Sequence, residues 1–142
     1  MPHILDLIAA ARRGRRAVRA ARKSGYHSEI ARVAGSAPVG GQVCTRPAHD
    51  DVRPLRALWR ITTLNRKADQ EPIYLTAALL AHGRDTVLTI GRESAPPGRE
   101  AHHLLWVSVD GEVVSTGLPV AELCVPLATL PPRHGPESSR TI

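Results

Sequence analysis

The stretch from Ala68 to Thr116 decides the fold, because it contains IYLTAALLAHG (73–83), then VLTIG (87–91), then LLWVSVDGEVVST (104–116). Apolar residues in the first segment recur at spacings of three and four, as one buried face of a helix requires. The segment ends in His-Gly, which is typical of a helix C-terminus. We therefore expect a helix that ends near residue 83.

A strand and a hairpin are expected to follow this helix. Residues 87–91 are aliphatic or β-branched and stop at a glycine, which predicts a strand. Residues 104–109 and 112–116 are two further β-rich runs on either side of Asp110-Gly111. Because aspartate and glycine tolerate the positive φ angles of a two-residue turn, these runs predict a hairpin.

The segment before this stretch predicts another helix, over residues 50–65. Leu55 and Trp59 belong to an apolar stripe at helical spacing. Asp50 or Asp51 is expected to be the N-cap of this helix.

The segment after the hairpin, residues 118–130, mixes apolar residues with prolines, which favours an edge strand over a central one. Within it, Cys124 lies between two aliphatic residues and is expected in the core.

The net charge of +6 is confined to residues 1–35, which hold eight basic and two acidic side chains, whereas residues 36–142 hold eleven of each. This segment predicts a helix that Gly14 weakens, with a break there left open. One face is apolar and another is basic (Ile4, Leu7, Ile8, Ala11, Val18; Arg12, Arg16, Arg19, Lys23). The basic face either meets nucleic acid, an anionic membrane surface or an acidic peptide, or is the solvated side of a helix docked on the core.

Composition argues against several classes of protein. No run of eighteen apolar residues predicts a transmembrane helix, and no signal-peptide pattern is recognisable, so we expect a cytoplasmic protein. Cys44 and Cys124 are eighty positions apart and lack metal-ligand spacing. We therefore expect no disulfide framework, no metal and no other cofactor.

These patterns predict an α+β domain in which N-terminal helices pack on a small antiparallel sheet. Its expected parts are a basic helical arm (1–34), a loop (35–49), the principal domain (50–132) and a disordered tail (133–142).

Residues 50–132 resemble the transglutaminase-like cysteine peptidases that remove leader peptides during lasso-peptide maturation. In that family a helix ending in Gly precedes a Leu-Val-Ile-Gly strand, then Ala-His-Ala-Trp-Val-Glu-x-Asp-Gly, then a tail near Leu-x-x-Pro-Pro. The counterparts here are residues 73–83, 87–91, 106–111 and 126–132. The resemblance implies a transglutaminase-like, that is papain-like, cysteine peptidase scaffold.

The catalytic residues of this family have no counterparts at the matching positions. Counting from Gly83 and from Trp106, the cysteine, histidine and carboxylate positions hold Ala68, Leu104 and Thr116. The acids that follow position 68 would also disfavour a thiolate at the helix start. The resemblance therefore implies a pseudoenzyme.

A rearranged site is the alternative for catalysis. His103 is one residue from the family histidine position, and it serves only if a β-bulge turns it to the other face of the strand. Cys44 is the candidate nucleophile if its loop folds over the helix start. Otherwise His103 is a strand-end histidine and Cys44 an ordinary loop thiol.

Three functions are compatible with these patterns. The first is a non-catalytic binding or accessory subunit in lasso-type peptide maturation, whose partners are a precursor peptide and other maturation proteins such as a leader-binding protein or a cyclase. The second is an active cysteine protease that removes a leader peptide through the rearranged site, and the third is a small basic nucleic-acid-binding module. For the first function the candidate residues for binding the peptide or the partner are Arg12, Arg13, Arg16, Arg19 and Trp106.

Overall fold

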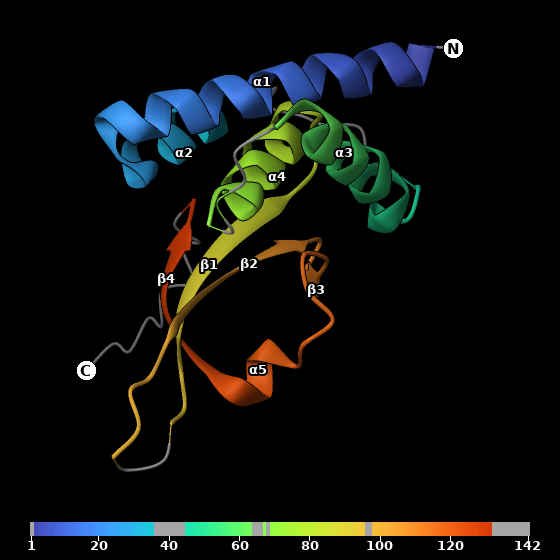
Figure 1. Ribbon diagram of the computed structural model, residues 1–142. Coiled ribbons are helices and arrows are strands. Elements are labelled where there is room, and N and C mark those ends of the chain that lie inside the picture. The colour runs from blue at the N-terminus through green and yellow to red at the C-terminus, as the bar shows by residue number, and fades with distance from the viewer. Residues whose placement is uncertain (1, 36–44, 64–66, 68, 96–97, 132–142) are drawn as a thin grey trace, which may run out of the picture.

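The protein is α+β, with a helical layer on one face of an antiparallel sheet (Figure 1). The computed structural model describes residues 2–35, 45–63, 67, 69–95 and 98–131. The helices of the layer are α1 (Pro2–Ser24), α2 (Tyr26–Gly35), α3 (Ala48–Thr62) and α4 (Gln70–Ala81). The expectation of helices packed on a small antiparallel sheet is confirmed.

The sheet has the strand order β3-β2-β1-β4, and every neighbouring pair is antiparallel. Its strands are β1 (Thr86–Glu93), β2 (His103–Val109), β3 (Glu112–Val113) and β4 (Cys124–Leu130). The edge position expected for the proline-containing segment is therefore confirmed for β4. A short helix that the sequence did not predict, α5 (Val120–Leu123), lies on the sheet face opposite the helical layer (Figure 1).

Helix α4 is the centre of the molecule. Every residue from Ile73 to Leu80 is buried, because α1 covers one side of the helix and the sheet covers the other. A helix that is apolar on all sides needs such double cover. The helix ends at His82-Gly83, as the sequence predicts, and Gly83 has a φ of 86°.

The hairpin also forms at the predicted position. Asp110 and Gly111 both have positive φ, 52° and 86°, and β2 pairs with β3 across them. On the face away from α4, Trp106 packs with Val120 and Cys124 and is 6% exposed. Its ring lies over Gly91, where an added Cβ would come within 2.5 Å of it. Cys124 is a core residue, as expected.

Helix α1 is continuous through Gly14, so no break occurs there. It docks on α4 so closely that a Cβ at position 14 would lie 2.7 Å from the Tyr74 carbonyl oxygen. Small residues therefore form most of the buried face, whereas Ile4, expected on that face, is 58% exposed. The docking of this segment on the core is observed, and a binding partner for its exposed basic face stays a prediction.

The expected N-cap of α3 is wrong. The helix begins at Ala48 after Pro47, so Asp50 and Asp51 lie inside its first turn. Asp51 is fully buried and accepts hydrogen bonds from Nε (2.8 Å) and Nη2 of Arg84. Arg84 also donates to the carbonyl oxygen of Arg46, and the pair thereby ties the start of α3 to the turn between α4 and β1.

Several sequence predictions lie outside the described residues. These are the positions of Cys44 and Ala68, most of the loop 35–49 and the tail 133–142. Among the residues that the structure describes, no helix is both long and apolar enough to cross a membrane.

We predict that Gly14→Ala lowers the free energy of unfolding by about 1–3 kcal/mol, because the new methyl group would overlap Tyr74 and push α1 away from α4. Gly35→Ala is the matched control, since Gly35 also lies in a helix and has open space around it. Urea unfolding of both variants measures the effect. Equal stability of the two variants would contradict the close approach.

We predict that Asp51→Asn costs about 3–5 kcal/mol of folding free energy, because the buried Arg84 guanidinium then keeps only the exposed Asp110 carboxylate, 3.8 Å away, as a counter-charge. Asp50→Asn changes the neighbouring residue of the same helical turn, which is exposed, and should cost less than about 0.5 kcal/mol. Thermal unfolding monitored by circular dichroism compares the two variants.

Candidate functional site

The structure describes two of the three positions at which the resemblance places a catalytic group. Leu104 packs with Trp106 on the sheet face opposite α4, whereas Leu105 and Val107 belong to the core on the α4 side. Thr116 uses its hydroxyl in a local turn, where Oγ1 accepts the Leu118 N–H at 3.1 Å. Neither position presents an acid, a base or a nucleophile to the start of α4.

An arginine bridges the places where this chemistry would lie. Arg56 of α3 donates from Nε to Glu71 in the first turn of α4 at 2.7 Å and from Nη2 to the Ser115 carbonyl oxygen. The Ser115 hydroxyl in turn accepts the Val107 N–H at 2.9 Å. These contacts join the start of α4, the end of the hairpin and β2. The polar groups here therefore stabilise the fold.

The rearranged site stays a prediction. His103 is exposed at the start of β2, and strand alternation gives it the same face as Leu105, the face on which α4 packs. The β-bulge occurs elsewhere, as a register shift at Ile90/Gly91 between β1 and β4, and the pairing of β1 with β2 is regular past His103. Cys44 lies outside the described residues.

The predicted binding residues lie on different sides of the molecule. Arg12, Arg13 and Arg16 are exposed on α1, and Arg19 lines a hollow beside that helix. Trp106 is buried on the sheet face opposite the helical layer. Trp106 therefore shares no surface with the arginines, and the role of each residue in binding stays a prediction.

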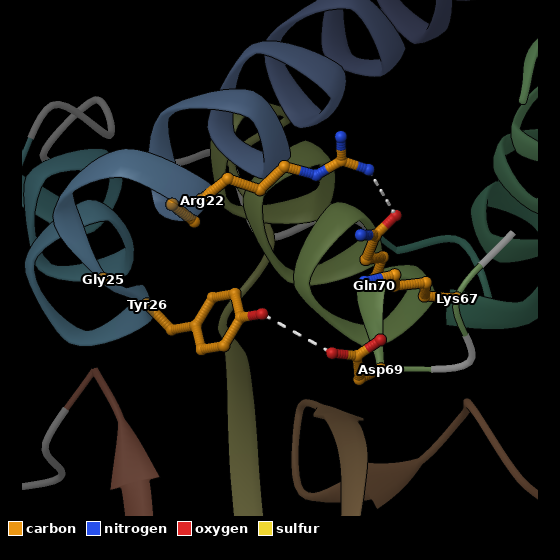
Figure 2. Close-up of a pocket in the computed structure, with 7 residues that line it drawn as sticks. Arg22, Gly25, Tyr26, Lys67, Asp69 and Gln70 are labelled. Atoms are coloured by element: carbon orange, nitrogen blue, oxygen red, sulfur yellow. Dashed lines mark hydrogen bonds between the residues drawn. The ribbon is translucent and has the colours of Figure 1, made fainter. Parts of the chain in front are cut away.

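Two hollows lie along α1, and together we name them the arginine groove. The larger, about 530 Å³, lies between the end of α1, the start of α2 and the start of α4, and its polar or charged lining residues are Arg22, Tyr26, Lys67, Asp69 and Gln70. In Figure 2 the side chains of Arg22 and Gln70 point toward each other, with Nη2 of Arg22 donating to Oε1 of Gln70 at 3.0 Å. The Tyr26 hydroxyl donates to Asp69 at 3.5 Å.

The smaller hollow, about 190 Å³, shares Arg22 and Gln70 with the larger one. Arg15 and Arg19 line it from α1, and Thr62 and Thr63 line it from the end of α3. Among the described residues that line this hollow, three are arginines and none is acidic. Of these three, the sequence-based candidates for binding a peptide or partner include Arg19 alone, because the exposed basic stripe does not show which arginines face a neighbouring element.

The floor of the smaller hollow is rigid and apolar. Trp59 stacks on Tyr74 with ring centroids 4.8 Å apart, and the Tyr74 hydroxyl donates to the Leu55 carbonyl oxygen at 3.1 Å. Burial raises the pKa of Tyr74 to about 12, and the nearby Arg15 charge opposes this shift. The proton on this hydroxyl is therefore held firmly at neutral pH.

The arginine groove is suited to binding anions. Guanidinium groups present several donors in a fixed plane and pair with carboxylates through two hydrogen bonds. Among the described residues no cluster of histidine, cysteine, aspartate and glutamate could hold a metal ion. The groove therefore offers recognition of negative charge by side chains.

Another cluster of titratable groups lies apart from the groove. Nε2 of His82 is 3.9 Å from the buried Asp51 carboxylate. A histidine beside a buried carboxylate also occurs in catalytic sites, but here Arg84 already binds the carboxylate and the cluster joins three segments of the fold. We assign it a structural role.

Comparison of the chain with protein families, with curated proteins and with solved structures gives no match.

We predict that the free energy of unfolding falls between pH 10 and 12 in part because of Tyr74. Its pKa of about 12 in the folded state lies above the ordinary value of 10.0, so the unfolded chain loses this proton first as the pH rises. The resulting decrease in the free energy of unfolding approaches about 1.4 kcal/mol per pH unit in this window.

Urea unfolding of the wild type and Tyr74→Phe at pH 8 to 11 isolates this contribution, which the variant should lack. A titration followed by tyrosine absorbance in Tyr26→Phe, which keeps Tyr74 as its one tyrosine, gives the pKa directly. A midpoint at 10 would contradict the effect of burial.

Proposed function

We propose that this protein is a non-catalytic binding or accessory subunit in the cytoplasmic maturation of a ribosomally made, lasso-type peptide. On this proposal it binds a precursor peptide, or a partner enzyme that processes the precursor. It resembles a leader peptidase in the order of its motifs, and the catalytic positions of that family hold Ala68, Leu104 and Thr116.

One observation carries the proposal. The start of α4, which a peptidase of this kind uses for its nucleophile, is instead joined by Arg56 to the segment after β3. Leu104 and Thr116 add no base and no carboxylate. On this proposal, two of the three reactive positions hold an apolar side chain and a turn hydroxyl, and the first turn of α4 carries an ion pair that joins elements of the fold.

The surface beside the start of α4 supports a role in binding. Lys67 and Asp69, the neighbours of position 68 in the sequence, both line the larger hollow of the arginine groove. The end of the scaffold at which a peptidase would act therefore lies beside a hollow with room for part of a peptide chain. Such a site can retain a peptide without cleaving it.

The proposal predicts that the full-length protein, tagged and captured from its own host at moderate salt, brings down an intact precursor peptide or a peptide-maturation enzyme, identified by mass spectrometry. The captured precursor should stay uncleaved when it is incubated with the purified protein. Cys44→Ala should behave like the wild type.

Two outcomes contradict this prediction in different ways. A shortened precursor whose formation is lost in Cys44→Ala would establish an active cysteine protease. Recovery of nucleic acid alone, released as the salt concentration rises, would establish a nucleic-acid-binding protein.

A further inference from the structure

We propose that the arginine groove binds an acidic, extended peptide segment, with a carboxylate side chain of that segment in the smaller hollow. The proposal rests on the proposed function in taking a peptide as ligand. It goes beyond that function by assigning the site and the chemistry of the segment that the site recognises.

The charges of the smaller hollow select an anion. Arg15, Arg19 and Arg22 are separated by four and three positions on α1, so their side chains leave the helix from neighbouring turns on one side. Arg19 and Arg22 are exposed, and Arg15 is half-buried. Each guanidinium can therefore reach a ligand, and a carboxylate between two of them gains hydrogen bonds from both.

The hydrogen bond between Arg22 and Gln70 lies between the two hollows, since both residues line each of them. A carboxylate is a stronger acceptor for a guanidinium than a neutral amide is. A bound acidic side chain therefore displaces the Gln70 oxygen from Arg22. The released Gln70 amide then has a donor and an acceptor for the backbone of the peptide.

The larger hollow decides between a peptide and a nucleic acid. Asp69 lines it, with the Tyr26 hydroxyl as its partner, so this end of the groove carries a negative charge beside Lys67. A phosphate group has no hydrogen-bond donor for the Asp69 carboxylate at this point. A peptide offers N–H donors to the Asp69 carboxylate and acidic side chains to the arginines, so its chemistry matches both ends of the groove.

The base of the smaller hollow is held in place by contacts within the core. Trp59 is 4% exposed and stacked on Tyr74, whose hydroxyl is bound to Leu55, so the base of the smaller hollow does not need to rearrange. A rigid site loses little conformational entropy on binding. The arginines above the floor are the adaptable part.

The test uses the full-length protein and a fluorescent synthetic peptide of glutamates spaced by glycine and serine, with a glutamine version as the uncharged control. Anisotropy at physiological salt should show binding of the glutamate peptide alone. Arg19→Gln/Arg22→Gln should weaken this binding by about tenfold or more, because two charge-assisted contacts are lost.

Arg13→Gln/Arg16→Gln is the matched control. The sequence named Arg13 and Arg16 as candidates for binding, but neither is among the described residues that line the groove, and the variant removes two charges with the same spacing from exposed positions on the same helix. It should weaken binding by less than about threefold, the part due to general attraction. Circular dichroism confirms that each variant is folded.

Three results would overturn the proposal. These are no binding of the glutamate peptide, an equal loss of affinity in the two double arginine variants, or a single-stranded oligonucleotide that binds more tightly and depends on Arg19 and Arg22. Because the probe is not a precursor peptide, its binding can succeed when the protein captures no precursor. Binding of the glutamate peptide without capture of a precursor would reject the role in maturation, and the arginine groove would remain a binding site for acidic peptides.

Discussion

The close approach of α1 to α4 at Gly14 is the constraint on which the rest of the structure depends. Because residue 14 has no side chain, α1 lies against the backbone and ring of Tyr74. Tyr74 in turn stacks on Trp59, and the docked helix places one row of arginines beside the end of α3 and the start of α4. The packing of the core and the position of the arginine groove thus have one cause.

Two ion pairs complete this arrangement by fixing α3. Asp51 and Arg84 hold its start to the turn before β1, and Arg56 joins its middle to Glu71 and to the chain after β3. Breaking a buried pair is far more costly than breaking an exposed one, so Asp51 and Arg84 act as a fixed joint between the helical layer and the sheet. The groove lies at the other end of α3, where Thr62 and Thr63 line it.

The two faces of the sheet serve different purposes. The face toward α4 is a continuous apolar core, and the opposite face carries a smaller cluster in which Trp106 lies over Gly91. Position 104, where the resemblance would place a histidine, belongs to the smaller cluster. The leucine at this position contributes to packing.

The sequence by itself determined the elements whose signals are local. The periodicity of residues 73–83, the Asp110-Gly111 turn and the prolines of residues 118–130 act over a few neighbours, and the helix, the hairpin and the edge strand formed where they predict. Only the tertiary structure decided that Asp51 pairs with Arg84, that Gly14 lies against Tyr74 and which arginines line the groove. The reason is distance along the chain, because Asp51 meets Arg84 across 33 residues and Arg22 meets Gln70 across 48, and no local pattern records such contacts.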